Sequence, residues 1–372
     1  MVAGEMSGDL LGAGLIKAIK KIHPGAIFEG IGGEKMIAEG FNSLADQERL
    51  AVMGFVAPLK RLPELLKIRK RIVNHFLSDP PDVFIGIDST GFNIPIERKF
   101  KQAGIKSVHY VSPQIWAWRQ GRVHKIAKSV NLMLTLFPFE AKFYQEHDVP
   151  VTFVGHTLAD TIPLESDKVE ARRLLNLDPD KKLIALLPGS RKSEVELLGD
   201  EFLAAAQFCL SKIPELSFII PAANQQRYSQ IEKQLQKHSD LPVKLILAQS
   251  HQAMSAADVV LMASGTTTLE ALLLKKPMVV AYKFPALSYA IYSRLLKIPH
   301  IALPNILAGR ELVPELIQDK VSAESLGRAL LKYFEDPELT NHLRQEYLNI
   351  HQQLKRNASE RAAEAILDLI AS

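Results

Sequence analysis

The chain has 372 residues, a length that suggests two domains rather than one. Apolar residues make up 47% of it and charged residues 23%, which is typical of folded globular proteins and excludes a disordered chain. The net charge of +4 predicts no nucleic-acid partner, and the single cysteine excludes a disulfide framework and a cysteine-rich zinc site. No apolar run approaches the roughly 20 residues that cross a bilayer, and no signal peptide is visible, so we expect a reduced, cytoplasmic protein.

Short apolar runs alternate with amphipathic segments along the whole chain. We expect strands at residues 26–28, 83–87, 107–111, 132–136, 183–187, 217–220, 243–247, 259–262 and 278–281. Segments with apolar residues three and four apart, such as 10–19 and 269–274, lie between them and are typical of helices. Continuous apolar strands separated by helices predict the α/β class, with parallel sheets buried on both faces.

This alternation occurs twice, once before and once after a stretch at 157–177 that contains Pro163 and a charged turn. We therefore predict one α/β domain at residues 1–160 and a second at 161–340. Apolar residues at helical spacing from 341 to 372 predict a C-terminal helix. Two such domains facing each other would form a cleft, which is a common place for small-molecule sites.

Open α/β sheets bind ligands at the carboxyl ends of their strands, so the residues after each apolar run are candidates. The first turn, residues 4–9, has small side chains at Ser7 and Gly8 that let a ligand approach the N–H groups of the following helix. The alternative is a plain strand-to-helix turn capped by Asp9. The glycines at 30–33 do not complete a dinucleotide fingerprint, because Lys35 replaces the third glycine, which disfavours a nicotinamide dehydrogenase.

Asp88 follows the predicted strand 83–87, where a carboxylate could accept a proton from a hydroxyl nucleophile or could merely cap the next helix. Ser112 follows the next strand, 107–111. Both tryptophans, Trp116 and Trp118, come shortly after it beside several bases, which suits a phosphate or a membrane surface as well as simple packing.

Two further turns in the second half could bind an anion. Gly189, Ser190 and Arg191 follow the strand 183–187 and offer close backbone approach and hydrogen-bond donors. A run of small hydroxyl residues after the strand 259–262 begins a helix, the favoured position for a diphosphate, and an acidic side chain one turn later could reach ribose hydroxyls. These residues are Ser264, Gly265, Thr266, Thr267 and Glu270. The alternative is an ordinary N-cap followed by a surface glutamate.

Taken in order, the motifs closely resemble the lipid-A-disaccharide synthases, membrane-associated glycosyltransferases of the GT-B type with two Rossmann-like domains facing across a cleft. The resemblance runs from end to end of the chain. It is carried by residues 4–9 (GEMSGD), 50–54 (LAVMG), 110–113 (YVSP), 116–119 (WAWR), 155–156 (GH), 187–191 (LPGSR), 263–266 (ASGT) and 303–305 (LPN).

The resemblance implies an inverting transfer of 2,3-diacylglucosamine from UDP-2,3-diacylglucosamine to 2,3-diacylglucosamine 1-phosphate, which yields UDP and a β(1→6)-linked disaccharide. It implies that Asp88 is the base and that Arg191 and the 264–267 turn stabilise the leaving UDP. Glu270 would hold the ribose and Asn305 would line the donor side, with Ser7, Gly8 and Ser112 on the acceptor side. Neither a cofactor nor a metal ion is expected.

In such an enzyme the C-terminal helix packs back on the N-terminal domain, and the lipid substrates require contact with the inner face of the cytoplasmic membrane. The stretch 52–76 carries six bases, Lys60, Arg61, Lys67, Arg69, Lys70 and Arg71, against the single acid Glu64. Apolar residues lie between the bases, so we expect an amphipathic helix that binds the membrane surface; the alternative is a helix packed on the sheet with solvated bases. A homodimer is left open.

The chain departs from the family at two places. Gly91 stands where the family commonly has an aspartate, three residues after the catalytic one, and the first strand is nearly absent. These departures keep open the alternative of a non-catalytic lipid- or UDP-binding paralogue. Another UDP-N-acetylglucosamine transferase of the same architecture is a second alternative, against which the Trp116–Trp118 segment and the Gly4 turn argue.

Overall fold

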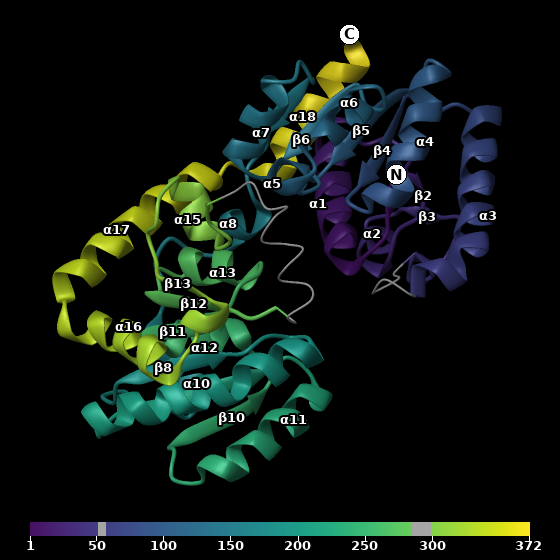
Figure 1. Cartoon of the computed structure of the whole chain (residues 1–372). Helices are drawn as coiled ribbons and strands as arrows, with labels where there is room; N and C mark the ends of the chain where they lie inside the picture. The colour runs from purple at the N-terminus through teal and green to yellow at the C-terminus, as the bar shows by residue number, and fades with distance from the viewer. Residues whose placement is uncertain (51–56, 285–298) are drawn as a thin grey trace. The chain divides into compact units, whose positions relative to one another are not determined.

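The computed structural model describes residues 1–50, 57–284 and 299–372, and the side chains of 57–60 are outside that description. The chain divides into two compact units: Met1–Asp160 with Leu354–Ser372 (unit 1) and Thr161–Gln353 (unit 2). Each is built on a parallel sheet with helices packed against it (Figure 1). The α/β class with parallel sheets is therefore confirmed, and the end of the chain does return to the first unit.

Unit 1 contains a five-stranded sheet in the order β1-β4-β5-β6-β7, which β2 and β3 extend through a bridge from Val2 to Ile31. Its strands are β1 (Val2–Ala3), β2 (Glu29–Gly30), β3 (Asn42–Ser43), β4 (Val83–Ile87), β5 (Lys106–Tyr110), β6 (Leu132–Thr135) and β7 (Val151–Phe153). Its helices are α1 (Met6–Ile22), α2 (Glu34–Ala38), η1 (Gln47–Arg49), α3 (Ala57–Ser78), α4 (Thr90–Gln102), α5 (Ile115–Trp118), η2 (Gln120–Arg122), α6 (Val123–Ala127), α7 (Pro138–Gln145) and α18 (Ala358–Ala371), with α8 (Thr157–Thr161) at the boundary.

Apolar side chains cover both faces of this sheet. On one face Leu15 of α1 and Ile366 of α18 are fully buried in the same cluster as the strands. On the other face Phe76 of α3 and Phe100 of α4 pack against Phe84 of β4. Helices on both faces are what a parallel sheet of continuous apolar strands requires.

Unit 2 contains a six-stranded sheet in the order β10-β9-β8-β11-β12-β13. Its strands are β8 (Leu183–Leu187), β9 (Ser217–Ala222), β10 (Val243–Leu247), β11 (Val259–Ala263), β12 (Met278–Tyr282) and β13 (Glu315–Ile317). Its helices are α9 (Lys168–Leu174), α10 (Lys192–Lys212), α11 (Gln225–Leu235), η3 (Gln236–His238), α12 (Ser250–Ala256), α13 (Thr267–Leu273), α15 (Leu303–Ala308), η4 (Gln318–Lys320), α16 (Ala323–Glu335) and α17 (Pro337–Leu354). No helix of the described residues is long and apolar enough to span a bilayer.

The strand order reverses once in each sheet. In unit 1 the chain runs outward from β1 to β3 and returns to β4 on the other side of β1; in unit 2 it runs outward from β8 to β10 and returns to β11. Ala3 is the partner of Ile87 at the first reversal, and Met262 of Leu187 at the second. Ligands of open α/β sheets bind at the carboxyl ends of strands at such reversals, so the loops after these four strands are the candidate ligand-binding loops.

Several short strands differ from the expectation. The strand expected at 26–28 is β2, at Glu29–Gly30, and β3, β7 and β13 were not predicted. Each of these has two or three residues, too few to produce a periodic pattern in the sequence. The first strand, β1, is also only two residues long, but both are fully buried.

The C-terminal segment is two helices rather than the single helix expected from 341 to 372. The break comes between Leu354 and Ala358, where Asn357 has a left-handed backbone with φ 56. The Asp160 carboxylate accepts hydrogen bonds from three successive backbone N–H groups, 356 to 358, at 2.7–3.0 Å, and so caps α18. Only the part from Leu354 onward belongs to unit 1.

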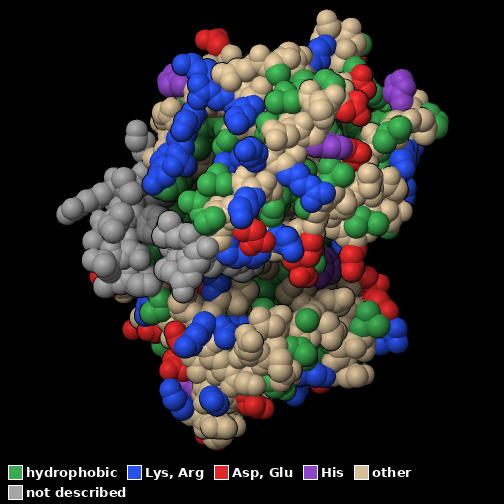
Figure 2. All heavy atoms as spheres, turned by 90° about the vertical axis from the view of Figure 1, so that its right-hand side faces the viewer, with side chains coloured by type: hydrophobic (Ala, Val, Ile, Leu, Met, Phe, Trp, Pro, Cys, Tyr) green, Lys and Arg blue, Asp and Glu red, His purple; other side chains and the backbone are tan. Residues whose placement is uncertain are grey.

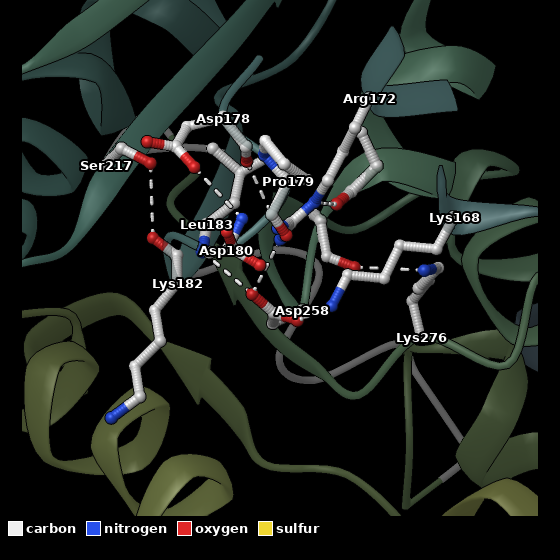
Figure 3. A network of polar contacts seen from close by, with 12 residues as sticks. Lys168, Arg172, Asp178, Pro179, Asp180, Lys182, Leu183, Ser217, Asp258 and Lys276 are labelled. Carbon is white, nitrogen blue, oxygen red and sulfur yellow. Dashed lines mark hydrogen bonds and ion pairs between the residues drawn. The ribbon is translucent and has the colours of Figure 1, made fainter. Parts of the chain in front are cut away.

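A charged network closes the amino end of the unit 2 sheet, opposite the edge where ligands are expected (Figure 3). Asp258 pairs with Lys168 and Arg172 and also accepts the N–H of Leu183 at 2.8 Å. Lys276 is 4% exposed and donates to the carbonyls of residues 255 and 257 at 2.7 and 2.9 Å. Burial lowers the pKa of Lys276 to about 7, helped by three nearby cations (Lys168, Arg344 and Arg172) and opposed by Asp258.

The lowered pKa of Lys276 makes the stability of unit 2 depend on pH. The unfolded lysine keeps its proton up to its ordinary pKa, so between about pH 7 and 10 the unfolded state binds more protons and the unfolding free energy rises with pH. Between pH 7 and 9 we expect the wild type to gain about 2 kcal/mol relative to Lys276→Met. Urea unfolding at both pH values measures this, with exposed Lys233→Met as the control. Equal pH dependence in Lys276→Met and the wild type would contradict it.

Candidate active site

The loops that follow β1 and β4 lie against each other at the reversal of the unit 1 sheet. A Cβ atom on Gly4 would lie 2.1 Å from Ser89 Oγ, so only glycine fits there without a shift of Ser89. Gly8 packs on Ala3 and Ile87, the paired last residues of the two strands. The sequence motif at 4–9 and Asp88 therefore belong to one site.

The main chain of Asp88 is held on both sides. Its N–H donates to the carbonyl of Tyr110 on β5 at 2.8 Å, and its carbonyl accepts from Asn93 Nδ2 at 2.9 Å. Asp88 and Ser89 both have left-handed backbones, with φ 50 and 41. The half-buried carboxylate of Asp88 has no partner among the described residues, so it is free to accept a proton from a ligand.

Asp9 has a different role from the helix cap considered above. The helix α1 already begins at Met6, and the Asp9 carboxylate is buried and accepts the N–H groups of residues 33, 35 and 36 at 2.9–3.0 Å. It thereby caps α2. Ser7 is exposed in the first turn of α1, and Gln47, which the sequence did not single out, donates to the carbonyls of residues 3 and 5 on either side of Gly4.

Ser112 and His156 are structural in this fold. Ser112 is 6% exposed, and its hydroxyl lies within hydrogen-bond distance of the Pro113 carbonyl, at 3.1 Å, and of the Tyr144 hydroxyl, at 3.2 Å. His156 Nδ1 accepts the N–H of Leu158 at 3.1 Å, and burial lowers the pKa of His156 to about 4 despite nearby Asp160. Ser112 thus faces the interior of unit 1.

The loops after β8 and β11 are neighbours at the reversal of the unit 2 sheet. Gly189 has φ 121, which favours glycine, and a Cβ atom there would lie 2.4 Å from Glu194 Oε2. That carboxylate oxygen accepts the N–H groups of Ser190 and Arg191 at 3.0 and 3.1 Å. The other oxygen pairs with Arg191 Nη1 at 3.1 Å. The donors predicted to bind an anion are therefore occupied by the chain's own carboxylate.

Glu194 was not singled out from the sequence, although its position three residues after the N-cap Arg191 is a capping signal. It neutralises part of the charge of Arg191, whose side chain is 77% exposed and can turn to a ligand at little cost. An incoming diphosphate would compete with Glu194 for the same three donors.

The loop after β11 leaves its backbone donors open. Among the described residues no acceptor contacts the N–H groups of Gly265, Thr266 or Thr267, and the space around Gly265 is empty to 4 Å. Ser264 Oγ donates to the carbonyl of Ile301 at 3.2 Å, which ties the loop to the 301–315 segment. Burial raises the pKa of Glu270, one turn into α13. Open N–H groups at a helix start suit an anion.

Asn305 is not available to a ligand in this structure. It is fully buried, and its amide donates to Val313 and Glu315 at 2.9 and 2.7 Å while its oxygen accepts two N–H groups of residues 312 and 313 at 2.7 and 2.8 Å. Glu315 also accepts the N–H groups of residues 301 and 302. Asn305 therefore shapes the segment next to Ser264.

The sequence profile of the family described as lipid-A-disaccharide synthetase matches residues 1–368. The lipid-A-disaccharide synthase of Cellvibrio japonicus is 56% identical over all of this chain and 96% of its own length, and that of Pseudomonas aeruginosa PA14 is 52% identical over all of this chain and 97% of its own. The chain belongs to this family. It is a hexosyltransferase of lipid A biosynthesis.

Solved structures agree on the fold of this family member. MurG of Acinetobacter baumannii superposes with a TM-score of 0.58 at 13% identity and covers 99% of the chain and 98% of its own. UDP-GlcNAc 2-epimerase of Neisseria meningitidis, solved with UDP-GlcNAc bound, has a TM-score of 0.63 at 14% identity and covers 97% of both chains. The GT-B fold expected from the sequence is thus confirmed.

The occupied donors of the 189–191 loop lead to a test with UDP. Arg191→Ala should weaken UDP binding about 10- to 150-fold, because a charge-assisted contact is lost at about 1.5–3 kcal/mol. Glu194→Gln should tighten UDP binding, since it keeps an acceptor for the two N–H groups but removes a competing negative charge. Calorimetry gives both dissociation constants, and Lys212→Ala at the far end of α10 serves as the control. An unchanged affinity in Arg191→Ala would remove this residue from the UDP site.

Proposed function

We propose that the chain transfers 2,3-diacylglucosamine from UDP-2,3-diacylglucosamine to 2,3-diacylglucosamine 1-phosphate, with Asp88 as general base. The observation that carries the proposal is the unpaired Asp88 carboxylate, whose main chain is fixed at the reversal of the unit 1 sheet. Inversion from an α-linked donor to a β(1→6) product needs one displacement and one base, and a single positioned carboxylate supplies that base.

The displacement follows from the charges. The Asp88 carboxylate takes the proton of the acceptor's 6-hydroxyl as its oxygen attacks C1 of the donor sugar, and the bond from C1 to the diphosphate breaks. UDP leaves with the negative charge. Arg191 and the open N–H groups of Gly265, Thr266 and Thr267 are placed on unit 2 loops that can stabilise that charge. Glu270 is the candidate partner of the ribose hydroxyls.

Replacing Asp88 by asparagine tests the base. Asp88→Asn keeps the shape of the side chain but cannot accept the proton, so turnover should fall about 10²- to 10⁴-fold while UDP affinity stays near that of the wild type. UDP release on addition of acceptor to UDP-2,3-diacylglucosamine measures turnover. Asp82→Asn, exposed at the amino end of the same strand, is the matched control. A wild-type chain that binds UDP but never releases it from the donor would instead support the non-catalytic alternative.

We further propose that α3 binds the inner face of the cytoplasmic membrane. Its C-terminal half is buried at Ile72, Val73 and Phe76, whereas Leu62 and Leu66 earlier in the helix are 45% and 47% exposed. Figure 2 looks onto the side of the molecule where α3 lies and shows Lys and Arg side chains gathered with hydrophobic ones between them. Exposed leucines beside bases suit an anionic interface.

The bases of α3 are not equivalent. Arg69 is half-buried; it donates from Nη2 to the Gly91 carbonyl at 2.8 Å and lies over the Phe92 ring, so it contacts α4. Arg61 pairs with Glu64 at 3.2 Å, and the Lys60 side chain lies outside the described residues. The bases left for lipid are three exposed residues without an ion pair among the described ones: Lys67, Lys70 and Arg71.

Charge reversal at these three residues tests the membrane contact. Lys67→Glu, Lys70→Glu and Arg71→Glu together should abolish sedimentation with anionic vesicles, since each base near the surface contributes about 1 kcal/mol. The same change at exposed Lys181, Lys233 and Lys332 of unit 2 alters net charge equally and should leave binding intact. Binding of the wild type should also weaken as salt rises. If the α3 variant still sediments, the contact lies elsewhere.

A further inference from the structure

Three polar side chains of the elements next to the Asp88 loop are completely buried. Asn93 and Glu97 come from successive turns of α4, and His109 comes from β5, the strand next to β4 (Figure 1). Each has an exposed fraction of 0%. Polar groups in such a position lower stability unless they are fully paired, so their presence here needs a reason.

Asn93 joins the two strands at the reversal. Its Nδ2 group lies within hydrogen-bond distance of three carbonyls, those of Val2 at 3.2 Å, Ile87 at 3.3 Å and Asp88 at 2.9 Å. Only the amide nitrogen can serve these acceptors, so the orientation of the side chain is fixed by its chemistry. The hydrogen bond from Asn93 thereby holds the Asp88 carbonyl in place.

Glu97 and Asn93 both rest on the same glycine of β4. A Cβ atom on Gly86 would lie 2.1 Å from Glu97 Oε1 and 2.8 Å from Asn93 Cβ, so a glycine is required for both side chains to fit. Gly86 is also the register partner of His109. Glu97 Oε1 contacts His109 Nδ1 at 2.7 Å, which completes a chain of contacts from β5 through α4 to the Asp88 loop.

The pair is held together by one proton between the carboxylate and the imidazole. Burial raises the pKa of Glu97, while the charge and hydrogen bond of His109 oppose part of that rise. Among the described residues no partner contacts Glu97 Oε2, His109 Nε2 or Asn93 Oδ1. Each unpaired atom has a free-energy cost, so apolar side chains of similar volume at both 97 and 109 would pack this core at least as well.

We propose that Asn93, Glu97 and His109 are positioning residues that set the place of the Asp88 carboxylate in the transfer reaction. Stability alone does not account for them, because their unpaired atoms oppose it. The need to position Asp88 accounts for them. The Asn93 amide contacts the carbonyls of Asp88, of its neighbour Ile87 and of Val2 on the adjoining strand β1. The inference rests on the proposed role of Asp88 as base.

The first test exchanges the donor amide for an acceptor. Asn93→Asp keeps the size of the side chain but places carboxylate oxygens against three carbonyls, so the Asp88 loop should shift. A displacement of about 1 Å at a reacting group can lower a rate about 100-fold, and we expect kcat to fall 10- to 100-fold with the Kd for UDP within twofold of the wild type. The acid limb of the pH profile of kcat should also move, because the Asp88 carboxylate then lies in different surroundings.

Two control variants separate positioning from a loss of stability. Asn131→Asp makes the same exchange at a residue that accepts the N–H of Ser107 at the other end of β5, and should leave kcat and its pH profile unchanged. Ile16→Val removes a methylene from the core of unit 1 and should lower the melting temperature without moving the acid limb. If Asn93→Asp keeps the acid limb of the wild type and its kcat falls no further than that of Ile16→Val at an equal loss of melting temperature, the inference is wrong.

Glu97 gives a second test that does not depend on the folding of the Asn93 variant. Glu97→Gln retains an amide that can pair with His109 Nδ1, so kcat should stay within about threefold of the wild type. Glu97→Leu leaves His109 Nδ1 without a partner, so kcat should fall at least tenfold. Equal kcat in both folded variants would overturn the proposal.

Failure of the proposed function has a different signature. If Asp88→Asn turns over normally, Asp88 is not the base, whatever the variants at 93 and 97 show. If Asp88→Asn is inactive while Asn93→Asp and Glu97→Leu fold and turn over like the wild type, only the positioning role is lost.

Discussion

At a reversal of strand order, two neighbouring parallel strands are followed by connections that lead to opposite sides of the sheet. The backbone carbonyl and N–H groups just after these strands therefore diverge. The groups just beyond β1 and β4, and beyond β8 and β11, therefore have no ladder to join. Side chains must satisfy them or a ligand must. In unit 1, Gln47 and Asn93 supply donors to the carbonyls of this crevice. In unit 2, Glu194 supplies an acceptor to two N–H groups, and three others stay open.

The two crevices have opposite polarity as a result. The unit 1 crevice turns side-chain amides inward and leaves a carboxylate free, which suits the removal of a proton. The unit 2 crevice offers backbone N–H groups and an arginine, which suits the arrival of negative charge. Glu194 already occupies three of the donors of this second crevice.

The sequence predicted most of the long strands and the helices between them, because five buried apolar residues in a row leave little choice of structure. It also placed the candidate site motifs at the carboxyl ends of the strands in each sheet. It did not predict how those residues are used. Asn305 and Ser112 are buried and fully engaged, Asp9 caps a helix other than its own, and Arg69 contacts the backbone of α4. Such pairings join residues far apart in sequence, so no local pattern encodes them.

The cap that Asp160 places on α18 has a consequence for how the protein is made. Asp160 is the last residue of the first segment of unit 1, and the helix it caps begins after the whole of Thr161–Gln353. At about 5–20 residues per second, a ribosome needs roughly 10–40 s to synthesise that intervening unit. Throughout that time Leu15 and Ile16 of α1 lack the covering that α18 provides at Ala362 and Ile366. The apolar face of α1 therefore reaches its final packing only after nearly the whole chain has been synthesised.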